Sequence, residues 1–84
     1  KESEDAVLGL GAALEGQGKF DAAHEIYAEF LSDNGKALGV LYNDSILLGN
    51  RLGQKEKAAQ QMLRYIQAGG KESAKAQETM RNWR

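Results

Sequence analysis

The stretch GKFDAAHEIYAEFLSDNG, residues 18–35, decides the fold, because residues 53–70, GQKEKAAQQMLRYIQAGG, keep its pattern 35 residues later. Both stretches begin and end with glycine, and large and small apolar residues keep their places between the glycines. A period of about 34 residues is typical of helical repeat proteins built from stacked hairpins. The matched pairs are Gly18 with Gly53, Ala23 with Ala58, Tyr27 with Met62, Phe30 with Tyr65, Leu31 with Ile66 and Gly35 with Gly70.

Apolar residues throughout the chain recur at steps of three and four, which is the period of an α-helix. The chain has no proline, so the glycines mark where helices end. The sequence therefore predicts helices at residues 3–16, 20–33, 36–51, 55–68 and 71–84. In the first of them the predicted buried stripe consists of Ala6, Val7, Leu10, Ala13 and Leu14.

These helices predict an all-α fold, an α-solenoid in which residues 1–84 form a single domain. Residues 1–35 make the first hairpin repeat, residues 36–70 make the second, and residues 71–84 make a C-terminal capping helix. A helical hairpin exposes an apolar stripe that it cannot cover alone, so neighbouring hairpins stack to bury it.

The composition excludes several classes of protein. Eighty-four residues allow one domain with a thin core. The chain has no cysteine, which excludes disulfides and thiolate zinc sites. A net charge of −1, with Lys and Arg spread along the chain, argues against nucleic acid or an anionic membrane as the partner. The apolar runs are too short to span a bilayer, so no membrane insertion is expected for this segment.

The spacing of small and large residues in the first hairpin resembles the tetratricopeptide repeat (TPR) signature. The resemblance implies a protein–protein interaction module or scaffold whose concave wall is lined by the first helix of each pair. The second copy departs from the signature at Ser45 and Ile46, and Gly35 and Gly70 stand where a proline usually separates repeats. The residues that carry the resemblance are Leu10-Gly11-x-Ala13-Leu14, Gly18-Lys19-Phe20-Asp21-x-Ala23, Tyr27 and Leu31.

A narrower resemblance concerns the first helix and the third. These segments are similar to TPR lipoproteins of bacterial tight-adherence (Flp) pilus assembly. That similarity implies a bacterial protein of the periplasm and outer membrane that helps a pilus or secretion complex assemble; without it, the expected location is the cytoplasm. The matching stretches are Ala6-Val7-Leu8-Gly9-Leu10-Gly11-Ala12-Ala13-Leu14, Leu41-x-Asn43-Asp44-x-x-x-Leu48 and Leu52-Gly53-Gln54.

No pattern of catalytic or metal-binding residues stands out. His24 is the only histidine, and without cysteines or a carboxylate cluster it makes no metal site, so a structural or solvated role is expected. The glycines at the first turn lack the Lys-Ser/Thr ending and the preceding strand of a phosphate-binding loop. The sequence predicts a non-enzymatic protein without metal or cofactor.

The predicted binding surface is the concave wall, and its partner is a protein or peptide segment. Leu8 and Leu47 are apolar residues outside the predicted buried stripes, as expected of a groove for an amphipathic segment. Alternatively, Leu47 packs against a neighbouring repeat. The residues predicted to contact the partner are Leu8, Ala12, Glu15, Asn43, Leu47, Asn50, Arg51 and Lys75.

The competing hypothesis is a structural role, in which the chain forms one layer of a homo-oligomer through its own helices. The first helix is apolar almost all round, so it needs cover from its hairpin partner and from something else, such as a second copy in a homodimer. On the last helix, Trp83 either caps the stack or forms an exposed interaction hot spot.

Overall fold

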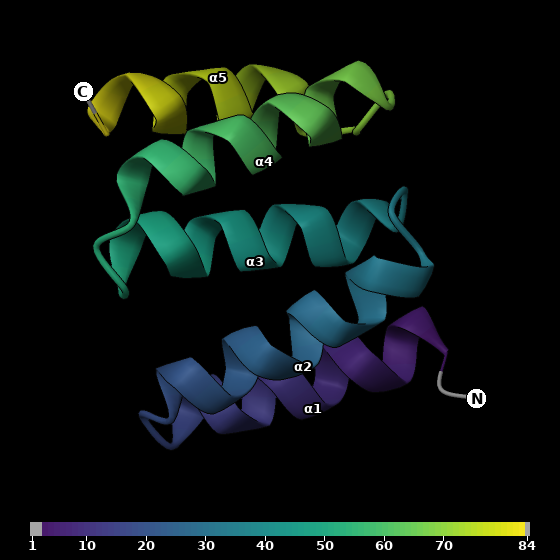
Figure 1. Cartoon of the computed structure of the whole chain (residues 1–84). Helices are drawn as coiled ribbons and strands as arrows, with labels where there is room; N and C mark the ends of the chain where they lie inside the picture. The colour runs from purple at the N-terminus through teal and green to yellow at the C-terminus, as the bar shows by residue number, and fades with distance from the viewer. Residues whose placement is uncertain (1–2, 84) are drawn as a thin grey trace.

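The computed structural model describes residues 3–83, and these residues form five helices and no strand (Figure 1). The predicted all-helical fold is therefore confirmed, and the helix ends agree with the predicted ranges to within two residues. Lys1, Glu2 and Arg84, which the predicted repeats include, lie outside the described residues. The helices are α1 (Glu4–Gly16), α2 (Phe20–Asp33), α3 (Leu38–Asn50), α4 (Lys55–Gln67) and α5 (Ser73–Asn82).

The helices stack in chain order, with α1 and α2 at one end, α3 in the middle, and α4 and α5 at the other end (Figure 1). Consecutive helices run in opposite directions. The middle helix, α3, packs against α1, α2 and α4. Each helix therefore finds most of its tertiary contacts with helices next to it in the chain.

The core is centred on α3, which is apolar on more than one side because it has neighbours on more than one side. The other helices each contribute a narrow buried stripe, such as Ala23, Tyr27 and Leu31 on α2. The buried residues of α3 are Val40, Leu41, Asp44, Ser45, Leu47, Leu48 and Gly49.

The buried stripe of α1 differs from the predicted one. Val7 and Gly11 are the buried residues of this helix, whereas Leu10 is 44% exposed. The reason is that Tyr27 of α2 lies directly against Gly11, where an added methyl group would overlap the tyrosine ring. A large ring on one helix thus fits over a glycine on the other and rotates the predicted apolar stripe partly toward solvent.

The turns between the paired helices require glycine. Gly18 follows α1 with a φ of 76°, and Gly53 follows α3 with a φ of 69°. Other residues pay a steric penalty in this left-handed region, whereas glycine does not. At the start of α1, Ser3 caps the helix, since its Oγ accepts a hydrogen bond of 3.1 Å from the backbone N–H of Ala6.

Enlarging the two matched alanines should destabilise the fold. Ala23 and Ala58 are each fully buried. Leucine at either position would overpack the contact between helices, and we expect the free energy of unfolding to fall by about 1–3 kcal/mol in each variant. Urea denaturation followed by circular dichroism measures the change. Ala28, which is exposed on α2, is the control, because Ala28→Leu should shift the midpoint little. Unchanged midpoints for both core variants would contradict this packing.

Candidate protein-binding groove

Three helices that alternate along the chain, α1, α3 and α5, contribute side chains to one hollow of about 510 Å³. Four of the eight residues predicted to contact a partner line it: Ala12, Glu15, Asn43 and Lys75. We call this hollow the α1/α3/α5 groove. Its lining residues are Ala12, Glu15, Tyr42, Asn43, Ile46, Lys75 and Thr79.

The prediction that Leu47 lines an open groove is wrong. Leu47 is 1% exposed and belongs to the hydrophobic core. Helix α3 is covered on several sides, so a residue outside one apolar stripe still meets a neighbouring helix. Leu8 is half-buried and packs against the core, close to Gly39 of α3. Neither leucine stands open to a partner.

Asn50 and Arg51 are exposed but are engaged at the end of α3, and neither lines the groove. The Oδ1 of Asn50 accepts a hydrogen bond of 2.9 Å from Nε1 of Trp83. The guanidinium carbon of Arg51 lies 5.3 Å from the centre of the Phe20 ring, which is within the range of a cation–π contact. Both side chains therefore tie neighbouring helices together.

Three groove residues, Tyr42, Ile46 and Thr79, were not predicted. Each lies one helical turn or less from a residue that was: Ile46 follows Asn43 by three positions, and Thr79 follows Lys75 by four. Residues at these spacings share a helix face. The helical spacing would therefore have indicated these three residues once the faces of α3 and α5 that line the groove were known.

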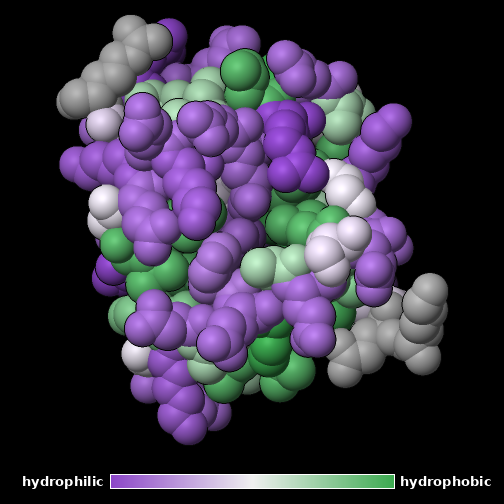
Figure 2. Space-filling view, viewed as in Figure 1, coloured by the Kyte–Doolittle hydropathy of each residue, from purple (hydrophilic) through white to green (hydrophobic). Residues whose placement is uncertain are grey.

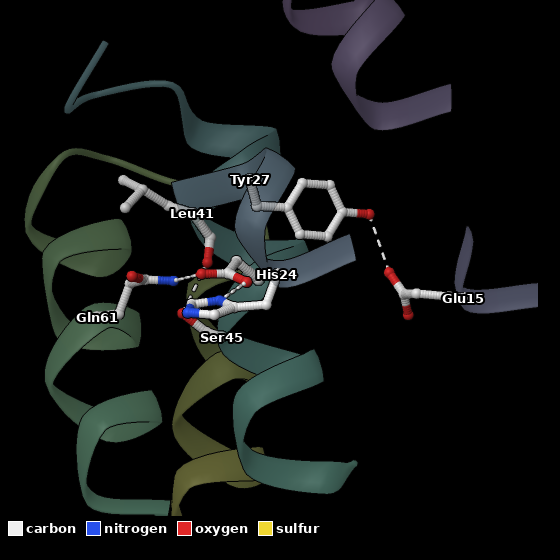
Figure 3. Close-up of polar contacts among 7 residues, drawn as sticks. Glu15, His24, Tyr27, Leu41, Ser45 and Gln61 are labelled. Atoms are coloured by element: carbon white, nitrogen blue, oxygen red, sulfur yellow. Dashed lines mark hydrogen bonds and ion pairs between the residues drawn. The ribbon is translucent and has the colours of Figure 1, made fainter. Parts of the chain in front are cut away.

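A hydrogen bond fixes the Glu15 carboxylate at the edge of the groove. The hydroxyl of Tyr27 donates to Glu15 Oε2 at 2.9 Å, as Figure 3 shows. Tyr27 is fully buried, so its position is set by the packing of α2 on α1. Burial raises the pKa of the Tyr27 hydroxyl above its ordinary value, and the hydrogen bond and negative charge of Glu15 raise it further. A carboxylate held in this way is a positioned acceptor for a ligand.

The raised pKa of Tyr27 predicts a loss of stability at high pH. Above pH about 10 the tyrosine of the unfolded chain loses its proton, while that of the folded chain keeps it. The free energy of unfolding should therefore fall by up to about 1.4 kcal/mol per pH unit through this one group. Below that pH the tyrosine keeps its proton in both the folded and the unfolded chain, so its contribution to the free energy of unfolding is fully present. Urea denaturation at a series of pH values measures the slope, and Tyr27→Phe should reduce it. An equal slope in both proteins would show that other groups cause it.

A second polar cluster joins α2, α3 and α4. Asp44 of α3 is fully buried. Its Oδ1 accepts a hydrogen bond of 2.8 Å from His24 Nδ1, and its Oδ2 accepts one of 3.0 Å from Gln61 Nε2. Figure 3 shows both side chains reaching the same carboxylate. Because a carboxylate only accepts, His24 carries its proton on Nδ1.

This cluster has the orienting part of a catalytic triad, but the serine beside it, Ser45, is not a free nucleophile. The hydroxyl of Ser45, the serine next in the chain to Asp44, is buried and donates to the backbone oxygen of Leu41 at 2.7 Å. A nucleophilic serine would need its hydroxyl to face the histidine and a substrate. The geometry instead suits a structural tie, in which one buried carboxylate is satisfied from the two helices on either side of α3.

Within residues 3–83, no three histidine, cysteine or acidic side chains lie close enough together to hold a metal ion. None of the helices described has the length and apolarity needed to cross a membrane.

Searches of family models, curated proteins and solved structures returned no match to this chain.

Proposed function

We propose that this chain is a non-enzymatic protein-binding module, a TPR-like α-solenoid that holds a segment of a partner protein in the α1/α3/α5 groove. One observation carries the proposal: helices that alternate along the chain each supply residues to a single hollow. In this arrangement α1 and α3 are the first helices of two hairpins, and α5 is a capping helix that completes the concave wall.

The lining of the groove suits an extended peptide. Tyr42 and Ile46 are half-buried and give an apolar floor, while the amide of Asn43 can both donate to and accept from a peptide backbone. Glu15 on α1 and Lys75 on α5 put opposite charges on the two outer helices of the groove. A peptide with a basic residue toward α1 and an acidic residue toward α5 would match both.

Core contacts fix the helices that line the groove. Tyr27 anchors α1 to α2, and Trp83 anchors α5 to α3. A site that is already formed loses little conformational entropy when a ligand binds, which favours affinity from a small contact area. By the narrower sequence resemblance, the proposed setting is a bacterial pilus or secretion complex.

Display selection with random peptides on the immobilised chain tests the proposal. Selected peptides should shift the amide resonances of α1, α3 and α5 residues around the groove in the ¹⁵N-labelled protein. Ala12→Arg, which fills the groove, should weaken binding by about tenfold or more. Ala28→Arg changes an exposed alanine of α2 and should leave binding unchanged. Resonance shifts confined to other faces, or no difference between the two variants, would contradict the proposal.

A further inference from the structure

Each end of the helix stack carries an exposed leucine. Leu10 of α1 is 44% exposed, and Leu63 of α4 is 48% exposed. The first lies at the end formed by α1 and α2, and the second lies at the end formed by α4 and α5 (Figure 1). Exposed leucines at the ends of a stack of helices raise the question of what covers them.

Helical geometry turns the N-terminal leucine away from the middle of the stack. Two residues along an α-helix are separated by about 200° of rotation, so their side chains point in nearly opposite directions. Leu8 packs toward Gly39 of α3, and Leu10 therefore points away from α3. On α2, His24 reaches Asp44 of α3, and Ile26 therefore points away from it as well. We call the resulting surface the N-terminal end face; it consists of Ala6, Leu10, Ala13 and Ile26.

Leu63 of α4 also points away from the middle of the stack. Gln61 of α4 donates to Asp44 of α3, so Leu63, two residues later, points away from α3. Leu63 lies one turn after Ala59, which lines a hollow of about 770 Å³ between α4 and α5. On the face that Figure 2 shows, hydrophobic areas appear near the upper and lower edges of the stack, and others appear between them, within a mostly hydrophilic surface. We call the second surface the C-terminal end face; it consists of Leu63 together with Ala59 and Met80 of this hollow, and the charged residues Lys55, Glu56 and Arg81 line the hollow beside them.

The two ends carry opposite charge, although the whole chain is nearly neutral. Residues 3–35 contain seven acidic side chains and one lysine, for a net charge of −6. Residues 36–83 contain eight Lys and Arg against four acidic residues, for a net charge of +4. The basic residues are therefore segregated by hairpin, which corrects the expectation that they are spread evenly. Glu29 follows Ile26 by three positions on α2 and brings acidic charge to the N-terminal end face.

We propose that copies of this chain associate head to tail, with the N-terminal end face of one copy seated on the C-terminal end face of the next. Leu10 of one copy would enter the hollow beside Leu63, and the acidic residues of α2 would approach Lys55 and Arg81. The expected alternative, a symmetric dimer through α1, brings two ends of charge −6 together, and like charges oppose it. A head-to-tail contact uses different surfaces on the two copies, so it generates a chain or a ring. The α1/α3/α5 groove lies on another face and stays free.

Sedimentation equilibrium of the full 84-residue chain tests the association. We expect the average mass to rise with protein concentration, from micromolar to millimolar, without levelling at the dimer. Raising NaCl from about 50 to about 500 mM should weaken association several-fold, because salt screens the opposite charges. A monomer at every concentration, or a mass that levels at the dimer, would overturn the proposal.

Two complementary variants give the sharper test. Leu10→Glu removes the N-terminal end face and Leu63→Glu removes the C-terminal one, so each alone should be monomeric, with association at least about tenfold weaker. Mixed together, they should form a one-to-one heterodimer through the two intact faces. In a symmetric α1 dimer, Leu63→Glu would remain dimeric and mixing would rescue nothing.

Both leucines are about half exposed, so the variants should keep the helical circular dichroism of the parent chain. Ala28→Glu adds the same charge on the side of α2 that carries His24 and should associate as the parent does. Failure of the mixed variants to pair, with folding intact, would refute the proposal and leave the peptide groove unaffected.

Discussion

Replacing Trp83 with alanine should lower the free energy of unfolding by about 3–5 kcal/mol, the largest effect expected of any single substitution in this chain. Trp83 is 8% exposed, and its ring lies against Gly49 near the C-terminal end of α3. Its Nε1 also donates to Asn50 at 2.9 Å. Within α5 itself only Ala76 is buried, so the tryptophan provides most of the anchorage of this helix. Of the two roles expected for Trp83, this burial supports the cap.

Two further variants separate the effect of burying the ring from the effects of its hydrogen bond and of its contact with Gly49. Trp83→Phe keeps much of the buried ring and loses the hydrogen bond, and it should cost less than Trp83→Ala. Gly49→Ala would place a methyl group inside the volume of the ring and should displace the tryptophan from α3. Since Trp83 is the only tryptophan, its fluorescence reports this displacement, while circular dichroism follows unfolding in all variants. Equal stability of Trp83→Ala and the parent chain would show that α5 does not depend on this contact.

His24→Ala should have the second largest effect, toward the lower end of about 3–5 kcal/mol. The substitution leaves the buried carboxylate of Asp44 with Gln61 as its remaining side-chain donor. Moving a charge from water into the protein interior is unfavourable, and a contact with a partner offsets that cost. A buried charge that loses its partner therefore destabilises the folded chain. The side chain of His24 is 26% exposed, so water entering the vacated space reduces this cost. Urea denaturation of the variant at neutral pH measures the effect.

A double variant tests whether the cost comes from the stranded charge. His24→Leu combined with Asp44→Leu removes both polar partners and fills the space with apolar atoms, so it should be more stable than His24→Ala alone. Gln61→Ala leaves the contact with His24 intact and should cost less than His24→Ala. If the double variant proves less stable than His24→Ala, the cost of His24→Ala does not come from the unpaired carboxylate. The polar contacts of the cluster would then stabilise the fold more than apolar packing in the same space does.

The sequence was a good guide to the helices because local patterns determine them. The step of three and four between apolar residues and the glycines at positions 18 and 53 depend only on neighbouring residues. The residues Ala12, Glu15, Asn43 and Lys75 were placed on one wall by the register that the TPR resemblance implies, and they do line one hollow, while their contact with a partner stays a prediction. Patterns of this kind predict elements and faces well.

Contacts between helices were predicted less well, for two physical reasons. A helix with several neighbours has no single buried face, which is why Leu47 was assigned to an open surface while it is in the core. A polar contact such as that of His24 with Asp44 depends on how α2 and α3 cross, and the local sequence does not contain that angle. The signal that was available is an acidic residue, Asp44, between the apolar stretches 40–42 and 46–48 of one predicted helix, which indicates a buried carboxylate with a partner.

The stacking of helices in chain order has a consequence for how the chain folds. Contacts between neighbours in the chain close only short loops, and helical proteins of this kind fold within about a millisecond or less. During synthesis the α1–α2 hairpin leaves the ribosome before α3. Helix α3 packs against α1 and α2 and carries the carboxylate that binds His24, so we expect the first hairpin to acquire its final packing only after α3 has emerged.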